Sequence, residues 1–118
     1  MYFKSDEQKH EELVELKGGV GTLDFKHIVP PEQLYGAGAK LCVVSFEPGY
    51  SIGVHSHVEN FEIYYVLEGK ALVTDDEEER ILEPGDSEIC ANGHTHSIKN
   101  IGDGQLKILA AILNNFER

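Results

Sequence analysis

The chain has 118 residues, of which 41% are hydrophobic and 26% charged, the composition of one ordinary globular domain. Its 21 Asp and Glu residues outnumber its 10 Lys and Arg residues, and the net charge of −11 argues against binding to nucleic acid or to an anionic membrane surface. No apolar run reaches the roughly 18 residues that a membrane span needs, and the first ten residues are too polar for a secretory signal, so we expect a cytoplasmic protein.

The first forty residues carry a weak pattern. Residues 4–16 are polar with sparse apolar positions and predict either a short helix or a strand-like arm. A glycine-rich break at residues 18–21 follows, after which residues 22–29 alternate as a strand does. Residues 30–35 begin with two prolines and predict one helical turn. We therefore expect a less regular N-terminal arm.

From residue 40 onward, short runs of β-forming residues are separated by turn residues every eight to twelve residues or so, which is the spacing of an all-β domain. The runs cover residues 41–46, 51–55, 62–67, 70–74, 80–82, 87–91, 96–99 and 105–113. Strands this numerous and short hide their apolar faces in two sheets that close into a barrel. We predict a single domain over residues 1–118 with a core barrel at about 40–113, whose interior can hold a pocket.

Two of the breaks between strands read Glu-Pro-Gly, at residues 47–49 and 83–85. Proline fixes φ and glycine accepts a positive φ, so this pair suits the two central positions of a type II turn. A third break, the acidic run at residues 75–79, is either a solvent-exposed hairpin tip or a loop that binds a cation.

The two cysteines, Cys42 and Cys90, both lie in apolar runs, and neither has a Cys-x-x-Cys partner. This placement gives no support to a redox motif or a thiolate zinc site. It predicts buried free thiols that act as small hydrophobic side chains.

Three histidines and one glutamate form a group of potential metal ligands. Side chains in a strand alternate between its faces, so His55 and His57 can point to one face together. Glu62 follows at an odd offset from His57 and would face the other way on an uninterrupted strand, so a bend at residues 58–61 must intervene. His96 joins the group if its strand lies beside the others.

On the strand that Glu62 begins, Tyr64 shares the face of Glu62, while Ile63, Tyr65 and Leu67 point to the other face. Three neutral imidazoles and one carboxylate suit a divalent transition metal and leave two positions open on an octahedral ion. Iron, manganese, nickel, copper and zinc all tolerate such ligands.

The segments that carry these ligands resemble the two motifs of the cupin superfamily. The first motif, G-x5-H-x-H-x4-E-x6-G, is matched by Gly49, His55, His57, Glu62 and Gly69. The second, G-x5-P-x-G-x2-H-x3-N, is matched by Gly85, Gly93, His96 and Asn100. Ala91 stands where the second motif has proline, a departure that touches a turn and no ligand.

The resemblance implies a jelly-roll β barrel in which His55, His57, Glu62 and His96 bind one divalent metal. It also implies a homodimer formed by packing sheet on sheet, for which the apolar outer positions Ile63, Tyr65 and Leu67 are candidates. Packing between the two sheets of the barrel explains these outer positions as well.

Two further residues are candidates for catalysis. Tyr64 could donate a proton or orient a substrate, or it could be an ordinary packed tyrosine. His94 lies two residues before His96 and could be a base beside the metal, or a loop residue before the strand. Glu59 is near the ligands in the chain but outside the motif spacing, which favours a solvated position over a contact with an imidazole.

Two classes of function fit these features. The first is a small metalloenzyme that acts on a small oxygen-rich metabolite inside the barrel, as a dioxygenase, isomerase or decarboxylase. The second is a module that binds or senses a metal and a small ligand without turnover. Lys and Arg are scarce near the motifs, which disfavours a heavily anionic substrate such as a sugar phosphate.

Overall fold

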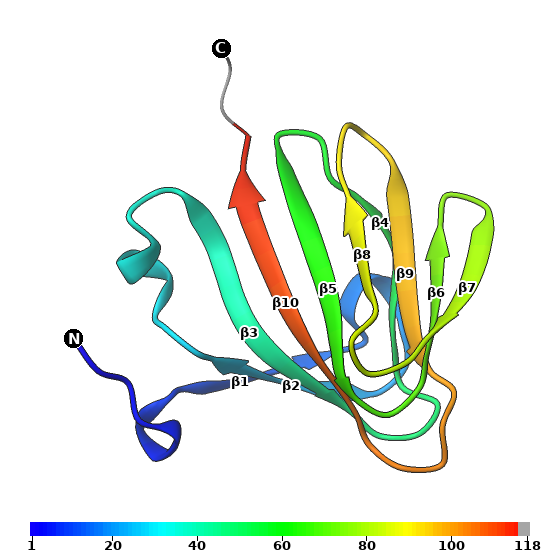
Figure 1. The fold of residues 1–118 in the computed structure, drawn as a ribbon, viewed down its shortest axis with the longest axis horizontal. Helices are drawn as coiled ribbons and strands as arrows, with labels where there is room; N and C mark the ends of the chain where they lie inside the picture. The colour runs from blue at the N-terminus through cyan, green and yellow to red at the C-terminus, as the bar shows by residue number, and fades with distance from the viewer. Residues whose placement is uncertain (116–118) are drawn as a thin grey trace.

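Two antiparallel sheets pack face to face in this computed structural model, which describes residues 1–115 (Figure 1). The six-stranded sheet has the order β1 (His10–Val14), β2 (Thr22–His27), β3 (Gly38–Phe46), β10 (Leu106–Asn114), β5 (Asn60–Glu68) and β8 (Ser87–Cys90). The four-stranded sheet has the order β4 (Ser51–Ser56), β9 (Thr95–Asn100), β6 (Ala71–Asp75) and β7 (Glu78–Leu82). The predicted all-β jelly roll is confirmed. In the described part of the chain, no helix is long and apolar enough to cross a membrane.

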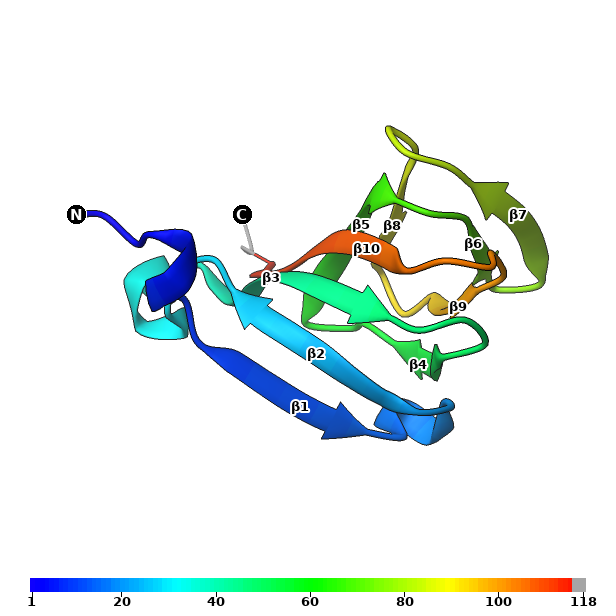
Figure 2. The same cartoon turned by 90° about the horizontal axis from the view of Figure 1, so that it is seen from below.

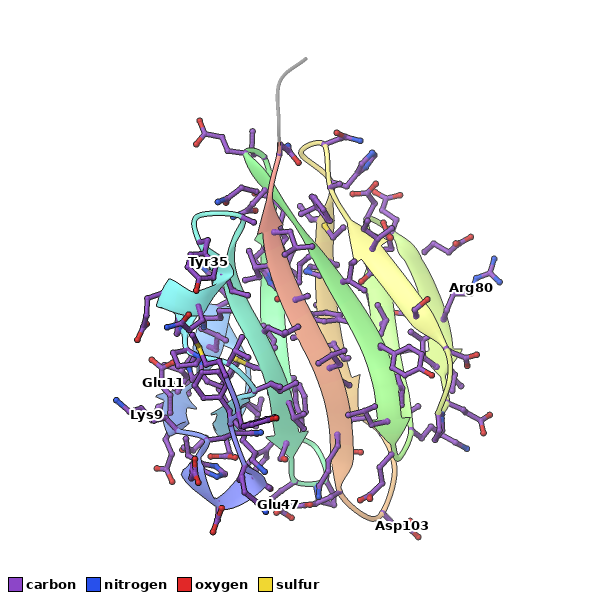
Figure 3. The ribbon with its side chains drawn as sticks, turned by 60° about the vertical axis from the view of Figure 1, so that its left-hand side comes forward. Lys9, Glu11, Tyr35, Glu47, Arg80 and Asp103 are labelled. Atoms are coloured by element: carbon purple, nitrogen blue, oxygen red, sulfur yellow. The ribbon has the colours of Figure 1, made fainter. Side chains whose placement is uncertain are left out.

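The core lies between the two sheets because the strands alternate inward apolar positions with outward exposed ones. On β5, Tyr64 and Val66 are fully buried, whereas Tyr65 and Leu67 are 40% and 44% exposed, as the alternation predicts. The buried apolar side chains of both sheets form one cluster that includes Leu23, Phe25, Val44, Phe46, Ile98, Leu106 and Ile108. Charged side chains such as that of Arg80 project outward from the ribbon (Figure 3).

The N-terminal arm is more regular than its sequence suggests. It opens with a 3-10 turn at Ser5–Glu7 and continues into β1, so both interpretations of residues 4–16 apply in part. Strand β1 pairs with β2 and β2 with β3, so that the two strands extend the six-stranded sheet (Figure 2). Four of the five residues of β1 are exposed, which explains why the strand shows no apolar alternation. The predicted helical turn is the 3-10 helix Pro31–Leu34.

The tight turns have the predicted geometry. In both Glu-Pro-Gly segments the glycine has a positive φ, +83° at Gly49 and +97° at Gly85. The amide three residues after each glutamate donates to the glutamate carbonyl, at 3.0 and 2.9 Å, as a type II turn requires. The acidic run is a hairpin turn, because Asp75 pairs with Glu78 across β6 and β7.

The two cysteines are buried and free, as the sequence predicts. Burial raises the pKa of the Cys42 thiol and of the Cys90 thiol to about 11. Both thiols are therefore neutral and unreactive at physiological pH, in keeping with a role in packing.

A buried asparagine at the end of β9 ties three segments together. The Nδ2 of Asn100 donates to the carbonyl oxygens of Phe46 and Gly104, at 3.0 and 2.9 Å. Its Oδ1 accepts a hydrogen bond from the amide of Gly102 at 2.9 Å. One side chain therefore satisfies backbone groups of β3 and of the turn before β10.

Replacing this side chain should destabilise the fold. We expect Asn100→Ala to lower the free energy of unfolding by about 2–4 kcal/mol, because it removes three hydrogen bonds, one of them to the buried Phe46 carbonyl. Urea denaturation would measure the loss. Asn114→Ala is the matched control, since its exposed side chain makes one hydrogen bond, to Gly36, and should cost less than about 1 kcal/mol. Equal losses for the two variants would contradict this account.

Candidate metal centre

Strand β4 carries an irregularity that aims its histidines inward. Its pairing with β9 shifts register between Ile52 and His55, so that both residues face the interior although they are three positions apart. Between them, Val54 is 67% exposed. A bulge of this kind changes which residues face the core. Without the bulge, the residues that alternate with Ile52 would face inward and His55 would face solvent.

The other ligands reach the same point from neighbouring strands. His96 on β9 lies directly opposite His55 on β4, and the two strands run side by side (Figure 1). Strand β4 ends at Ser56 and β5 begins at Asn60, so the predicted bend between His57 and Glu62 is present. Glu62 therefore enters the interior from the opposite sheet.

The four predicted ligands converge on one point. The Oε1 atom of Glu62 lies 3.1 Å from the Nε2 atom of His55, 3.1 Å from that of His57 and 2.9 Å from that of His96. The Nε2 atoms of His55 and His96 are 3.0 Å apart. All four residues could hold one metal ion, and three of them are buried. The structure brings together the complete set that the sequence predicts.

Each imidazole is oriented through its other nitrogen. The acceptors of the Nδ1 hydrogens are the Gly53 carbonyl for His55 at 2.8 Å, the Asn60 Oδ1 for His57 at 2.7 Å and the Glu88 carboxylate for His96 at 2.9 Å. A hydrogen on Nδ1 leaves the Nε2 lone pair of a neutral imidazole free to bind a metal. The three lone pairs and the carboxylate oxygen then form a set of four acceptors that face one another.

The charge of Glu62 holds this group together. Burial alone would raise the pKa of the Glu62 carboxyl. In the metal-free centre, a second proton on Nε2 lets the imidazoles donate hydrogen bonds to Glu62, and these keep its pKa well below its usual range. Burial lowers the pKa of His96, whereas its contacts with Glu62 and Glu88 raise it to about 9. The hydrogen bond to Glu62 also raises the pKa of His57. The carboxylate therefore attracts positive charge, which protons or a divalent cation can supply.

Tyr64 is in contact with the centre. Its ring stacks on that of His96, with centroids 4.5 Å apart and planes at 7°. The side chain is fully buried, and its hydroxyl has no hydrogen-bond partner among the described residues. Burial, with the nearby charge of Glu62, raises the pKa of Tyr64 well above its ordinary value, so the hydroxyl keeps its proton.

His94 and Glu59 lie away from the ligands. Strand β9 begins at Thr95, so His94 precedes it in the turn and does not share the inward face of His96. The His94 side chain is 59% exposed, and its Nδ1 lies 2.6 Å from Asp76 Oδ2. Glu59 is exposed, as predicted.

A cavity of about 340 Å³ adjoins three of the four ligands, His55, His57 and Glu62. Its walls include Lys17 and Lys40, together with the apolar side chains of Leu16, Phe25, Ile52 and Ile112. The expectation that cations are scarce around the site holds along the chain but is wrong in space. Lys40 could have been found from its alternation with the apolar residues of β3, but Lys17 lies in an irregular turn that gives no such signal.

Comparisons with known proteins agree on one family. The profile described as the cupin domain matches residues 42–112. An oxalate-binding protein of Thermotoga maritima is 31% identical over 113 residues, which cover 96% of this chain and 93% of that protein. An uncharacterized protein of Methanocaldococcus jannaschii is 33% identical over 85 residues, covering 72% of this chain and 68% of that protein. The crystal structure of a predicted oxalate decarboxylase from Thermotoga maritima superposes with a TM-score of 0.91 at 30% identity, covering 98% of this chain and 100% of that chain.

Removing the charge of Glu62 should abolish tight metal binding. We expect Glu62→Gln to lower the affinity for Mn²⁺ or Zn²⁺ by more than 100-fold or so, since loss of a residue that only orients a ligand already costs about 10–100-fold. Isothermal titration of metal-free protein would measure this. Glu59→Gln makes the same chemical change on an exposed side chain and should leave the affinity unchanged. Unaltered binding by Glu62→Gln would refute the site.

Proposed function

The chain belongs to the cupin family, and on that premise we propose that it holds one divalent transition metal on its three histidines and Glu62 and binds a small oxygen-donor ligand beside it. The observation that supports this most directly is the orientation of the imidazoles. All three Nδ1 hydrogens are engaged, so the Nε2 atoms face Glu62 as metal-binding lone pairs. The donor set of nitrogen and carboxylate oxygen fits iron, manganese, nickel, copper or zinc.

The class of ligand follows from the cavity and from the relatives. A space of about 340 Å³ suits a ligand of few atoms. One relative is named an oxalate-binding protein, and a similar solved structure is described as a predicted oxalate decarboxylase. We therefore propose that a small chelating carboxylate of the oxalate type binds in the cavity. A bound divalent ion would polarise the ligand oxygens as a Lewis acid.

A second candidate function is catalytic turnover, and Tyr64 favours it. Its buried hydroxyl has no hydrogen-bond partner among the described residues, so its proton is free to contact a substrate. Loss of CO₂ from oxalate breaks the carbon–carbon bond, and the carbon that keeps the electron pair must gain a proton to become formate. A neutral tyrosine that lines the cavity can supply that proton. His94 is a weaker candidate, since it is exposed and bound to Asp76. Formate released from oxalate would identify an enzyme, and binding without product would identify a binding module.

Oxalate binding should require the metal. We expect metal-loaded protein to bind oxalate in isothermal titration, and metal-free protein and His57→Ala to show no binding, because the centre provides the oxalate contacts. His10→Ala is the matched control, since its exposed side chain contacts Asp24 and is not among the described residues that line the cavity. Equal binding by metal-free and metal-loaded protein would contradict the proposal.

We also propose a homodimer that buries the outer face of β5 and β8. Tyr65, Leu67 and Ile89 are exposed there by 40%, 44% and 55%. Exposed apolar side chains grouped on one sheet face are typical of contact surfaces. The cytoplasmic location predicted from the sequence stays a prediction.

Light scattering would test the dimer. We expect twice the chain mass of 13.1 kDa for the wild type and the single chain mass for Leu67→Glu, because an unpaired buried charge opposes association. Val54→Glu, on an exposed residue of the other sheet, is the control and should stay dimeric. A wild-type protein that is monomeric at high concentration would exclude this interface.

A further inference from the structure

Lys40 is a cation on the inner face of the six-stranded sheet. It alternates along β3 with Cys42, Val44 and Phe46, all of which are fully buried. Lys40 itself is half-buried and lines the cavity beside the metal centre. A strand position of this kind normally holds an apolar residue, because an ammonium group loses hydration there.

The register of the sheet places Lys40 across from the centre. Lys40 lies opposite Ile112 on β10, and Ile112 lies opposite Glu62 on β5. The three residues thus form one row across three adjacent strands. Strands are about 4.8 Å apart, so the backbones of Lys40 and Glu62 are about 10 Å apart. A ligand bound between them would have the metal ligands on one side and the Lys40 ammonium on the other.

The Lys40 ammonium is held without an acidic partner. Its Nζ lies 4.5 Å from the centroid of the Phe25 ring, a cation–π contact that fixes its position. Among the described residues, none of the ion pairs involves Lys40, in a chain with 21 acidic residues. A fixed and partly desolvated ammonium group without a carboxylate is suited to bind an anion.

The cavity is positive inside an acidic protein. Two cations, Lys17 and Lys40, line it, and Glu62 is the only acidic side chain among its described lining residues. Lys17 has a φ of +56°, in the left-handed region that disfavours a side chain. Its turn packs tightly on β4, where a Cβ at Gly53 would lie 2.0 Å from the Lys17 carbonyl. With a divalent metal on Glu62, the cavity gains further positive charge.

We infer that Lys40 is a specificity-determining residue that selects a small dicarboxylate dianion, whose chelating oxygens face the metal centre and whose remaining anionic oxygens face the Lys40 ammonium. This inference rests on the proposed function, and it goes further by naming the charge of the ligand and the residue that recognises this charge. A neutral or singly charged chelator of the same shape would bind the centre but would make a weaker contact with Lys40.

Oxalate and oxamate test this inference, because oxamate replaces one carboxylate of oxalate by a neutral amide of the same shape. In metal-loaded protein, we expect Lys40→Met to lower the affinity for oxalate by about tenfold or more and to change that for oxamate far less. Lys40→Arg keeps the charge and should keep the preference for oxalate. Isothermal titration would give both affinities, and direct titration of the metal should give the wild-type value for each variant.

Lys107→Met is the matched control. Lys107 lies on β10 of the same sheet, between the buried Leu106 and Ile108, and so faces the outside. The change of charge is the same, and the ratio of oxalate to oxamate affinity should stay as in the wild type.

Two outcomes would overturn the inference. A Lys40→Met variant that binds metal normally and keeps both wild-type anion affinities would show that Lys40 does not contact the anion. An equal loss of affinity for both anions would show a general effect on the cavity. Failure of metal-loaded wild-type protein to bind either anion would instead overturn the proposed function, and the inference with it.

Discussion

The burial of the Glu62 carboxylate is the constraint on which the rest of the site depends. A charged group removed from water costs several kcal/mol or so unless it is paired and hydrogen-bonded. Here, three imidazoles lie within 3.1 Å of one carboxylate oxygen. The bulge in β4, the bend after His57 and the pairing of β4 with β9 all serve to bring those rings to the carboxylate.

The groups that surround the metal ligands set the orientation of the three imidazole rings. Acidic, amide and backbone oxygens, supplied by Glu88, Asn60 and Gly53, hold the three rings through Nδ1. The positive charge of the cavity comes from elsewhere, from β3 and from the turn after β1. The metal ligands and the groups that would contact a bound anion therefore have separate origins in the chain, although they line one space.

The four metal ligands could be predicted from the sequence, but the bulge and the cavity residues around them could not. The spacing of His55 and His57, the odd offset of Glu62 and the Pro-Gly turns follow from local rules of strand alternation and turn geometry. The bulge before His55 does not, because a shift of register depends on pairing with β9. The alternation of Lys40 with the apolar residues of β3 marks its inward face, but its distance from Glu62 is set by two strand pairings and cannot be predicted locally. The β1 strand was ambiguous because it is exposed and carries no apolar period.

The pairing of His55 with His96 also bears on folding kinetics. The two residues are 41 positions apart, and Glu62 belongs to the other sheet, so the complete set of ligands exists only when both sheets have assembled. Contacts between residues so distant form late in folding, because the chain between them must first be ordered. An interaction that is absent from the folding transition state slows unfolding and leaves the folding rate almost unchanged. A bound metal would thus slow the unfolding of this fold and lengthen the lifetime of the native state.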